Sequence, residues 1–329
     1  MSQRNRKRVI FSIIALAACA GAYLAADRYL IRHVEIADVA AYAASTSALA
    51  EDETAPSSSA VEEEAAAGDA QPAVEAITFD DWNYRSSALS ISISSHSSGS
   101  GGDALAWFVA DVLLTDAAQL QSAFADDQFG RNIIAYTSEI AAEHDAVFAV
   151  NGDYYGFRSD GIIIRDGVIY RDEPARVGLA FYRDGSLQVY DETQTTAEEL
   201  LAAGVWNTLS FGPALLDDGE ITANLANVEI DTNFGNHPIQ GNQPRTGVGM
   251  LAPNHFVFIV VDGRSKGYSA GVTLIEFAQM FRDLGCTEAY NLDGGGSSVM
   301  YFMGRVVNNP LGRNKERGTS DILYIGADA

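Results

Sequence analysis

Cysteine is nearly absent from this chain of 329 residues, which contains only Cys19 and Cys286. A disulfide framework and thiolate zinc sites are therefore excluded. Basic residues are also scarce, with 21 Lys and Arg against 44 Asp and Glu, which gives a formal net charge of −23. So acidic a chain argues against a nucleic-acid partner, because binding to phosphates requires many Lys and Arg side chains. It remains compatible with a local basic pocket.

Several catalytic signatures are missing as well. The sequence has no Gly-x-Ser-x-Gly elbow, no His-Glu-x-x-His helix, no Walker A loop and no Rossmann fingerprint. The common serine-hydrolase, zinc-peptidase and nucleotide-binding classes are thus disfavoured. What is present is an ordinary globular composition, with 47% hydrophobic and 10% aromatic residues.

The N-terminus resembles a membrane segment. Residues 9–26 are uncharged and follow four basic residues within residues 1–8. This pattern predicts a transmembrane signal anchor over residues 9–30, with a cytoplasmic tail and an extracytoplasmic remainder. Two alternatives are cleavage after Ala20 and lipidation of Cys19. The anchor is favoured because the apolar run continues beyond the cysteine.

Residues 31–81 are predicted to be an acidic, low-complexity linker. Residues 39–81 carry ten acidic residues and no basic ones, and they lack an apolar period. Such a segment has too little apolar surface to offset the entropy lost on ordering, and its like charges extend it. Residues 82–329 are long enough for one large domain.

Strand patterns dominate that domain. Residues 89–93 alternate strictly between apolar and polar, and residues 256–261 form an apolar run. Asp166-Gly167 and Asp184-Gly185 each separate two apolar runs, which predicts hairpins, and a further hairpin is expected about Gly304. Because hairpins outnumber βαβ units, the predicted fold class is α+β, with mainly antiparallel sheets and a few packed helices.

Three helices are expected, over residues 133–144, 195–203 and 273–284. The last has the strongest pattern, because its apolar residues fall on one face. Thr273 and Glu276 form a capping box at its start, and Gly285 ends it.

Polar clusters follow several apolar strands directly, so loops distant in sequence can converge on one site. The most informative cluster is the glycine-rich run that begins at Asp293. Its three glycines allow positive φ and a concave nest of N–H groups for an anion, to which the two serines add hydroxyl donors. The members of this run beyond the aspartate are Gly294, Gly295, Gly296, Ser297 and Ser298.

Arginines and carboxylates supply the remaining candidates. Arg245, Arg264 and Arg317 are candidate ligands for a phosphate or carboxylate. The candidate acid, base or metal-binding carboxylates are Asp153, Asp262, Asp293 and Glu316. Surface salt bridges and turn stabilisation are the ordinary alternatives for these residues.

The clusters, in this order, resemble the phosphodiester glycosidase family, which includes bacterial envelope proteins linked to exopolysaccharide biosynthesis. The likeness runs from about residue 109 to the C-terminus. The segments that carry it are Asn151-Gly-Asp-Tyr-Tyr, Ser210-Phe-Gly-Pro-Ala-Leu, Pro244-Arg-Thr-Gly-Val-Gly, Val261-Asp-Gly-Arg, Thr273-Leu-x-Glu-Phe-Ala, Asn291-Leu-Asp-Gly-Gly-Gly-Ser-Ser and Glu316-Arg-x-x-x-Ser-Asp.

The resemblance implies a hydrolase that cleaves the bond between an anomeric carbon and a phosphodiester oxygen, in a sugar phosphodiester or an anionic glycopolymer. Arg245, the 294–298 loop and Arg317 are then expected to hold the phosphate, with Arg264 nearby. Asp293 is the first choice for the catalytic carboxylate. Glu316 and Asp153 are the second choices, while Asn151, Gly152 and Asp262 would hold sugar hydroxyls or the loops.

Other functions stay open at this point. A divalent cation is compatible with the gathered carboxylates, although no ligand spacing demands one. The alternatives are a non-catalytic module that binds anionic glycopolymer, a metal-dependent phosphodiesterase that cuts the P–O bond, and a structural assembly protein.

Overall fold

The computed structural model describes residues 3–54, 77–230 and 237–327. The strands of this part pair only in antiparallel fashion and form five sheets. The α+β class and the antiparallel pairing are therefore confirmed.

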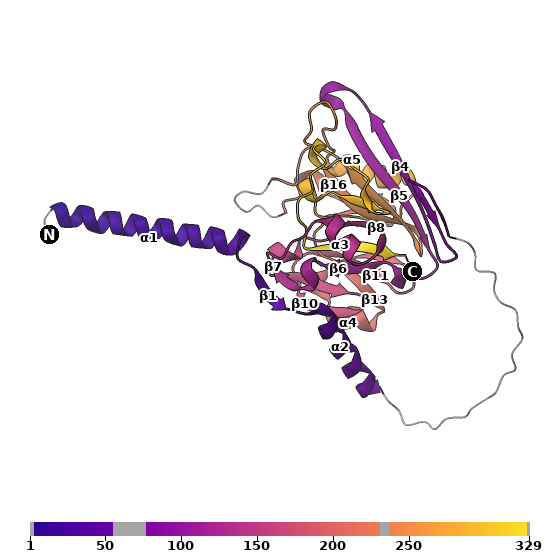
Figure 1. Cartoon of the computed structure of the whole chain (residues 1–329), viewed down its shortest axis with the longest axis horizontal. Coiled ribbons are helices and arrows are strands. Elements are labelled where there is room, and N and C mark those ends of the chain that lie inside the picture. The colour runs from indigo at the N-terminus through magenta and orange to yellow at the C-terminus, as the bar shows by residue number, and fades with distance from the viewer. Residues whose placement is uncertain (1–2, 55–76, 231–236, 328–329) are drawn as a thin grey trace, which may run out of the picture.

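The largest sheet has nine strands. In spatial order they are β15 (Glu220–Ile221), β14 (Ala214–Asp217), β18 (Glu288–Asn291), β16 (Arg245–Ala252), β17 (His255–Val261), β5 (Leu105–Leu114), β4 (Leu89–Ser98), β3 (Asn83–Arg85) and β2 (Thr78–Phe79). The β4–β5 hairpin is the long ribbon that rises from the body in Figure 1.

A second sheet has five strands: β20 (Arg305–Val306), β19 (Met300–Phe302), β8 (Ala146–Asn151), β21 (Asp321–Gly326) and β6 (Gln121–Phe124). The three smaller sheets are β12 (Leu187–Asp191), β11 (Val177–Tyr182) and β13 (Val205–Leu209); β9 (Gly161–Arg165) and β10 (Val168–Glu173); and β1 (His33–Ile36) and β7 (Phe129–Arg131). The helices are α1 (Gln3–Tyr29), α2 (Val39–Thr54), α3 (Thr137–Glu143), α4 (Ala197–Ala202) and α5 (Leu274–Leu284).

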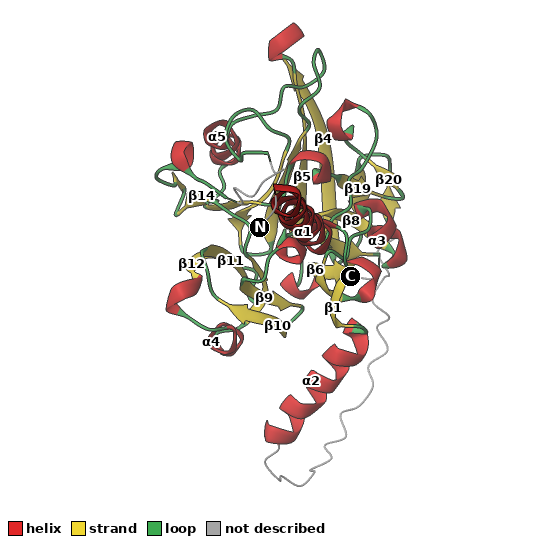
Figure 2. Ribbon diagram, turned by 90° about the vertical axis from the view of Figure 1, so that its left-hand side faces the viewer, coloured by secondary structure: helices red, strands yellow, loops and turns green. Residues whose placement is uncertain are grey.

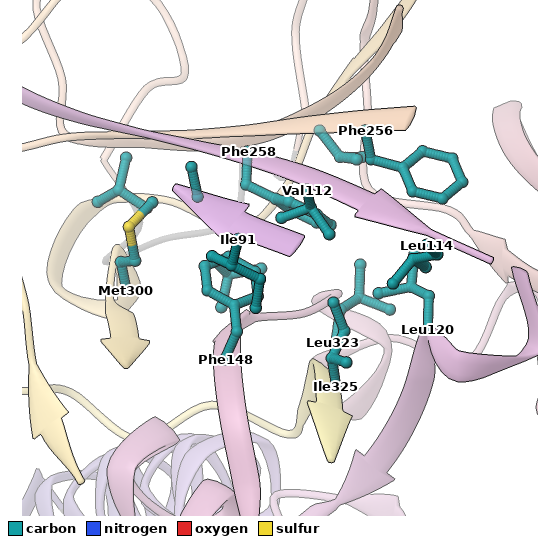
Figure 3. Close-up of a cluster of buried hydrophobic side chains, with 14 of the residues drawn as sticks. Ile91, Val112, Leu114, Leu120, Phe148, Phe256, Phe258, Met300, Leu323 and Ile325 are labelled. Carbon is teal, nitrogen blue, oxygen red and sulfur yellow. The ribbon is translucent and has the colours of Figure 1, made fainter. Parts of the chain in front are cut away.

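The main core lies between the nine-stranded and five-stranded sheets. Phe256 and Phe258 of the first sheet and Phe148 and Leu323 of the second belong to this buried cluster (Figure 3). On its other face the nine-stranded sheet packs against α5, and β17 contributes alternate residues such as Ile259 to that cluster. Burial on both faces explains why residues 256–261 are apolar without alternation.

The predicted hairpins and helices are largely present. The turns at Asp166-Gly167 and Asp184-Gly185 join β9 to β10 and β11 to β12. Helix α5 begins after Thr273, with a complete capping box, and ends at Gly285, whose φ is 90°. Helices α3 and α4 are shorter than expected, because each begins only after its own cap residue, Tyr136 or Thr196.

The N-terminal region differs from the expected linker at its beginning. Strand β1 pairs with β7, and α2 follows it, while residues 55–76 lie outside the described residues. Ile36 and Val39 pack against a buried aromatic cluster, and the hydroxyl of Tyr42 donates to the carbonyl of Ile169. These contacts are tertiary, so composition alone did not indicate them. Figures 1 and 2 show α1 projecting away from the body and α2 below it.

None of the helices in the described part of the chain combines the length and hydropathy required to cross a membrane. The anchor over residues 9–30 stays a prediction.

Candidate active site

Loops from several strand ends surround one pocket of about 650 Å³, part of which is open to solvent. They follow β8, β13, β17 and β18 and precede β16 and β21. The lining residues are Tyr154, Phe211, Ile230, His237, Pro238, Ile239, Gln243, Pro244, Arg245, Arg264, Asn291, Leu292, Asp293, Gly294, Gly295 and Arg317. The structure thus brings together the three predicted arginines, Asp293 and the start of the glycine run.

Arg245 begins β16 and is only 3% exposed. Its Nε donates to the carbonyl of Val272 at 3.1 Å, and its Nη2 donates to those of Ile239 at 2.7 Å and Gly241 at 3.2 Å. Burial, with a smaller contribution from Arg264, lowers its pKa to about 10. Among the described residues it has no carboxylate partner, so this buried cation lacks a counter-ion.

Arg264 follows the end of β17 and approaches the pocket from another side. Its Nε donates to Oε1 of Gln243 at 2.7 Å. Burial lowers its pKa, the nearby Arg317 lowers it further, and Asp293 opposes both effects. Its φ of 54° is unusual for a residue with a side chain, and such backbone strain tends to occur at functional sites.

Asp293 follows β18 directly and forms the negative part of the pocket. Nη2 of Arg317 lies 3.2 Å from Oδ2 of Asp293, and the aspartate side chain is 10% exposed. Asn151 fixes the backbone here, because its Nδ2 donates to the Asp293 carbonyl at 2.7 Å. Gly294 N–H donates to Oδ1 at 2.9 Å, which orients the carboxylate.

Four of the five N–H groups of the glycine run at residues 294–298 bond within the protein. The N–H of Gly294 donates to Asp293, that of Gly295 to the carbonyl of Pro244, and those of Ser297 and Ser298 to carbonyls of the run itself. These four donors are already used, and anion binding by the loop stays a prediction. The Ser297 Oγ and the Gly294 carbonyl accept from Arg317, so the loop holds that arginine beside Asp293.

Asp153 does not line the pocket. It is 2% exposed, and its Oδ2 accepts from Ser210 N–H at 2.6 Å and lies 3.7 Å from Nη2 of Arg165. Arg165 also pairs with Asp321 at 2.8 Å, and all three side chains are buried. Burial raises the pKa of Asp321 to about 6 despite the arginine. This network fixes the loop that carries Tyr154 rather than presenting a carboxylate to a ligand.

Glu316 is also turned away from the pocket. Its carboxylate accepts from both the backbone N–H and the hydroxyl of Ser138, in the first turn of α3. A carboxylate at that position satisfies a free N–H and complements the helix dipole. The structure therefore leaves Asp293 as the one predicted catalytic carboxylate that lines the pocket.

The other predicted residues support the loops. Asp262 is 1% exposed, burial raises its pKa, and it accepts from Asn308, Tyr268 and the N–H of Asn309. It thereby shapes the segment that carries Arg264. The four remaining predicted residues pack behind the pocket and do not line it: Asn151, Gly152, Gly296 and Ser298.

Sequence reasoning missed the aromatic wall, formed by Tyr154 and Phe211, and the buried Arg165. Tyr154 and Phe211 line the pocket with ring centroids 5.9 Å apart, in an edge-on arrangement. Both lie inside segments that carried the family resemblance, next to candidates chosen for their charge. Arg165 sits in an apolar strand beside a turn, and the sequence gives no local sign that it pairs with distant aspartates.

One acidic group among the described residues has a spacing suited to a cation, and it lies elsewhere. Asp217, Asp218 and Glu288 offer oxygens within 4.8 Å of one another. Glu288 begins β18, whereas Asp293 follows the other end of that strand. In the pocket, the carboxylate of Asp293 has an arginine as its charged neighbour.

The described pocket residues carry three arginines and one carboxylate, within a chain of charge −23. This excess of positive charge suits an anion, and guanidinium groups suit phosphate in particular. The carboxylate of Asp293, which lies beside these arginines, can assist attack at an adjacent carbon or orient a water molecule. The aromatic wall offers a flat apolar face.

Comparisons with known proteins show the family of this chain. The family model of the phosphodiester glycosidases matches residues 144–326. The chain is 32% identical over 195 residues to the SPbeta prophage-derived uncharacterized protein YomE of Bacillus subtilis (strain 168), which covers 56% of this chain but 29% of that protein. The chain thus spans less than a third of the length of that relative.

Solved structures share the fold. The catalytic domain of zebrafish N-acetylglucosamine-1-phosphodiester alpha-N-acetylglucosaminidase, auto-inhibited by its pro-peptide, superposes with a TM-score of 0.57 at 21% identity, covering 73% of this chain and 84% of that one. A hypothetical protein from Synechocystis superposes with a TM-score of 0.55 at 14% identity, covering 78% and 64%. Because the family model spans more than half of its residues, this chain belongs to the phosphodiester glycosidase family.

Proposed function

We propose that this chain hydrolyses the bond between the anomeric carbon of a sugar and the oxygen of a phosphodiester. Water supplies a hydroxyl to the carbon and a proton to the departing oxygen, so the products are a free sugar and a phosphate monoester. The observation that carries the proposal is the pairing, in one pocket, of Asp293 with three arginines that lack other acidic partners among the described residues.

The arginines suit the departing group. Negative charge develops on the phosphate as the bond breaks, and donors fixed in advance around it lower the barrier. Arg245 is held by three backbone carbonyls and Arg264 by Gln243, so both are oriented before a ligand arrives. Because a phosphate leaves more readily than an alcohol, no strong general acid is required beside it.

Asp293 is assigned to the sugar side of the broken bond. Its carboxylate would stabilise the oxocarbenium-like carbon or position the attacking water. Tyr154 and Phe211 offer an aromatic wall for the sugar ring. Asn291 also lines the pocket, and its buried Oδ1 has no hydrogen-bond partner among the described residues, so it can accept from a sugar hydroxyl.

A cell-surface glycopolymer or exopolysaccharide is the proposed substrate class, and the extracytoplasmic side of the cytoplasmic membrane is the proposed location. The basis for the location is the basic residues before the apolar run. In helix α1, Ile13, Ile14 and Leu16 are each more than 60% exposed, so apolar side chains are available to a lipid surface. Fractionation of cells, followed by high-salt and detergent extraction, tests this proposal. Recovery in the soluble fraction would contradict it.

The proposed reaction is tested with the Asp293→Asn variant and a matched control, Asp283→Asn, on the exposed side of α5. Each protein is incubated with N-acetylglucosamine-1-phosphodiesters, glucose-1-phosphodiesters and teichoic-acid fragments, and free sugar and sugar phosphate are measured separately. We expect free sugar from the unaltered protein and the control, and a loss of roughly 10²-fold or more in the variant.

Other results would identify the competing functions. Sugar phosphate and alcohol as products, with loss of activity on chelation, would indicate a metal-dependent phosphodiesterase. Binding of the fragments without turnover, unchanged in Asp293→Asn, would indicate a non-catalytic module.

A further inference from the structure

A second pocket adjoins the first on the far side of Phe211. The two pockets share Phe211 and Ile230, and the second encloses about 1310 Å³, part of it open solvent. It is lined by Arg131, Arg158 and Arg176 and by two acidic residues, Asp160 and Glu229. The proposed reaction uses none of these five residues.

Positive charge is concentrated along the two pockets together. Residues 82–329 contain 15 basic and 31 acidic residues. Six of those 15 basic residues line the pockets, whereas only three of the 31 acidic residues do so among the described positions. In a domain with two acids for each base, this reversal of the ratio concentrates positive charge at the two pockets.

Arg158 lies at the junction of the two pockets. Its Nη1 donates to the carbonyl of Ser210 at 3.2 Å, and its guanidinium lies 5.2 Å from the ring centre of Phe211 and 5.3 Å from that of Tyr154. These contacts orient the side chain but do not neutralise it. Within the described residues it forms no ion pair.

The other two arginines differ from each other in how their charge is balanced. Arg176 pairs with Asp160 at 2.5 Å and donates to Ser210, so an acid already offsets it. Arg131, at the end of β7, has no ion pair within the described residues. Glu229, also in the lining, offsets one of the remaining charges, so the second pocket carries one net positive charge, from Arg158 and Arg131.

We propose that the second pocket is an anion subsite that binds a second phosphate group of the substrate. On this inference, which rests on the proposed function, the substrate is an oligomer of sugar units joined by phosphodiesters and not a molecule with a single phosphodiester. One phosphate lies among the arginines beside Asp293, and a neighbouring phosphate reaches Arg158 and Arg131 across Phe211. The aromatic ring between them contacts the intervening sugar.

The test compares two probes that contain the same type of scissile bond, with kcat/KM expressed per bond. The first is the methyl phosphodiester of N-acetylglucosamine 1-phosphate, and the second is a synthetic trimer of N-acetylglucosamine 1-phosphate units. We expect kcat/KM to favour the trimer by about tenfold or more, as for a contact with a charged group. Arg131→Gln should remove that preference and leave cleavage of the methyl compound unchanged. Arg158→Gln should lower kcat/KM on the trimer more than on the methyl compound. Arg282→Gln, on α5, is the control.

Two results would overturn the inference. One is equal kcat/KM for the two probes in the unaltered protein. The other is an equal loss on both probes in Arg158→Gln, which would make that residue a support of the first pocket only.

A binding experiment separates failure of the subsite from failure of the proposed reaction. If no sugar phosphodiester is hydrolysed, calorimetry still measures binding of the trimer to the Asp293→Asn protein. Roughly tenfold weaker binding on adding Arg158→Gln supports the subsite even then. Unchanged binding refutes it.

Discussion

Arg317 donates from one nitrogen, Nη2, to the Asp293 carboxylate at 3.2 Å and to the Oγ of Ser297 at 2.9 Å. The guanidinium is half exposed, whereas the carboxylate is nearly buried. A bound phosphate would therefore share this arginine with Asp293. The same contact can hold Asp293 and Arg317 in position before the substrate arrives.

Anions should stabilise the folded protein through the unpaired arginines. A ligand that binds only the folded state adds about 2.7 kcal/mol when present at 100 times its Kd. We expect inorganic phosphate to raise Tm, and Arg245→Gln to reduce that rise, because it removes the buried cation without a counter-ion. Thermal melts at constant ionic strength check this. Equal rises in both proteins would count against an anion site at Arg245.

Substitution Gly295→Ala should impair the site more than its backbone strain alone explains. Gly295 has a φ of 70°, and an added Cβ would lie 3.1 Å from Nη1 of Arg264. Gly304→Ala is the matched control, because its φ is 83° and a Cβ there meets no atom within 4 Å. Both variants should lose about 1–2 kcal/mol of stability. Only Gly295→Ala should also lower kcat/KM, and equal kinetics in the two variants would contradict this.

Loss of Arg165 should destabilise the fold strongly. Arg165→Met leaves Asp153 and Asp321 buried without their cation. Removing one partner of a buried ion pair costs about 3–5 kcal/mol. Urea unfolding measures the change, with Arg183→Met as control, since Arg183 stacks on Trp206 and lies outside this network. A change below about 1 kcal/mol would mean that the network contributes little.

Asp166 should make stability depend on pH. Burial raises its pKa from the ordinary value of 3.8 to about 7. The folded state then holds a proton that the unfolded state has released, so this contribution to stability is complete below about pH 4 and is lost as pH rises to about 7. Asp166→Asn should flatten the fall in unfolding free energy across that window. Asparagine tolerates the positive φ of 51° there. An unchanged slope would refute the assignment.

Local patterns of the sequence predicted much of the fold. Helix α5 was found from Thr273, Glu276 and Gly285, because caps act over a few residues. The Asp166-Gly167 hairpin was found for the same reason. The contacts of β1 and α2 were missed because their partners are distant in the sequence; Tyr42 and Ile169, for example, are 127 residues apart.

The candidate site was only partly predictable. The pocket is lined by Arg245, Arg264, Arg317 and Asp293. All four were predicted as site residues because they are charged and lie next to a strand end. Charge alone did not separate these residues from Glu316, whose carboxylate bonds to Ser138, or Asp153, whose carboxylate bonds to Ser210 and faces Arg165. The direction of a side chain depends on the packed neighbour, which the sequence does not show locally. Whether these residues act on a substrate stays a prediction.

Asp293 is carried by β18 of the nine-stranded sheet, whereas Arg317 lies just before β21 of the five-stranded sheet. Their ion pair thus spans the interface between two separately hydrogen-bonded layers. A small slide of one layer over the other would directly change the distance between Asp293 and Arg317. Phe148 and Phe258 pack against each other between the layers and do not line the pocket. Conservative changes at either residue should therefore tune turnover while the protein remains folded.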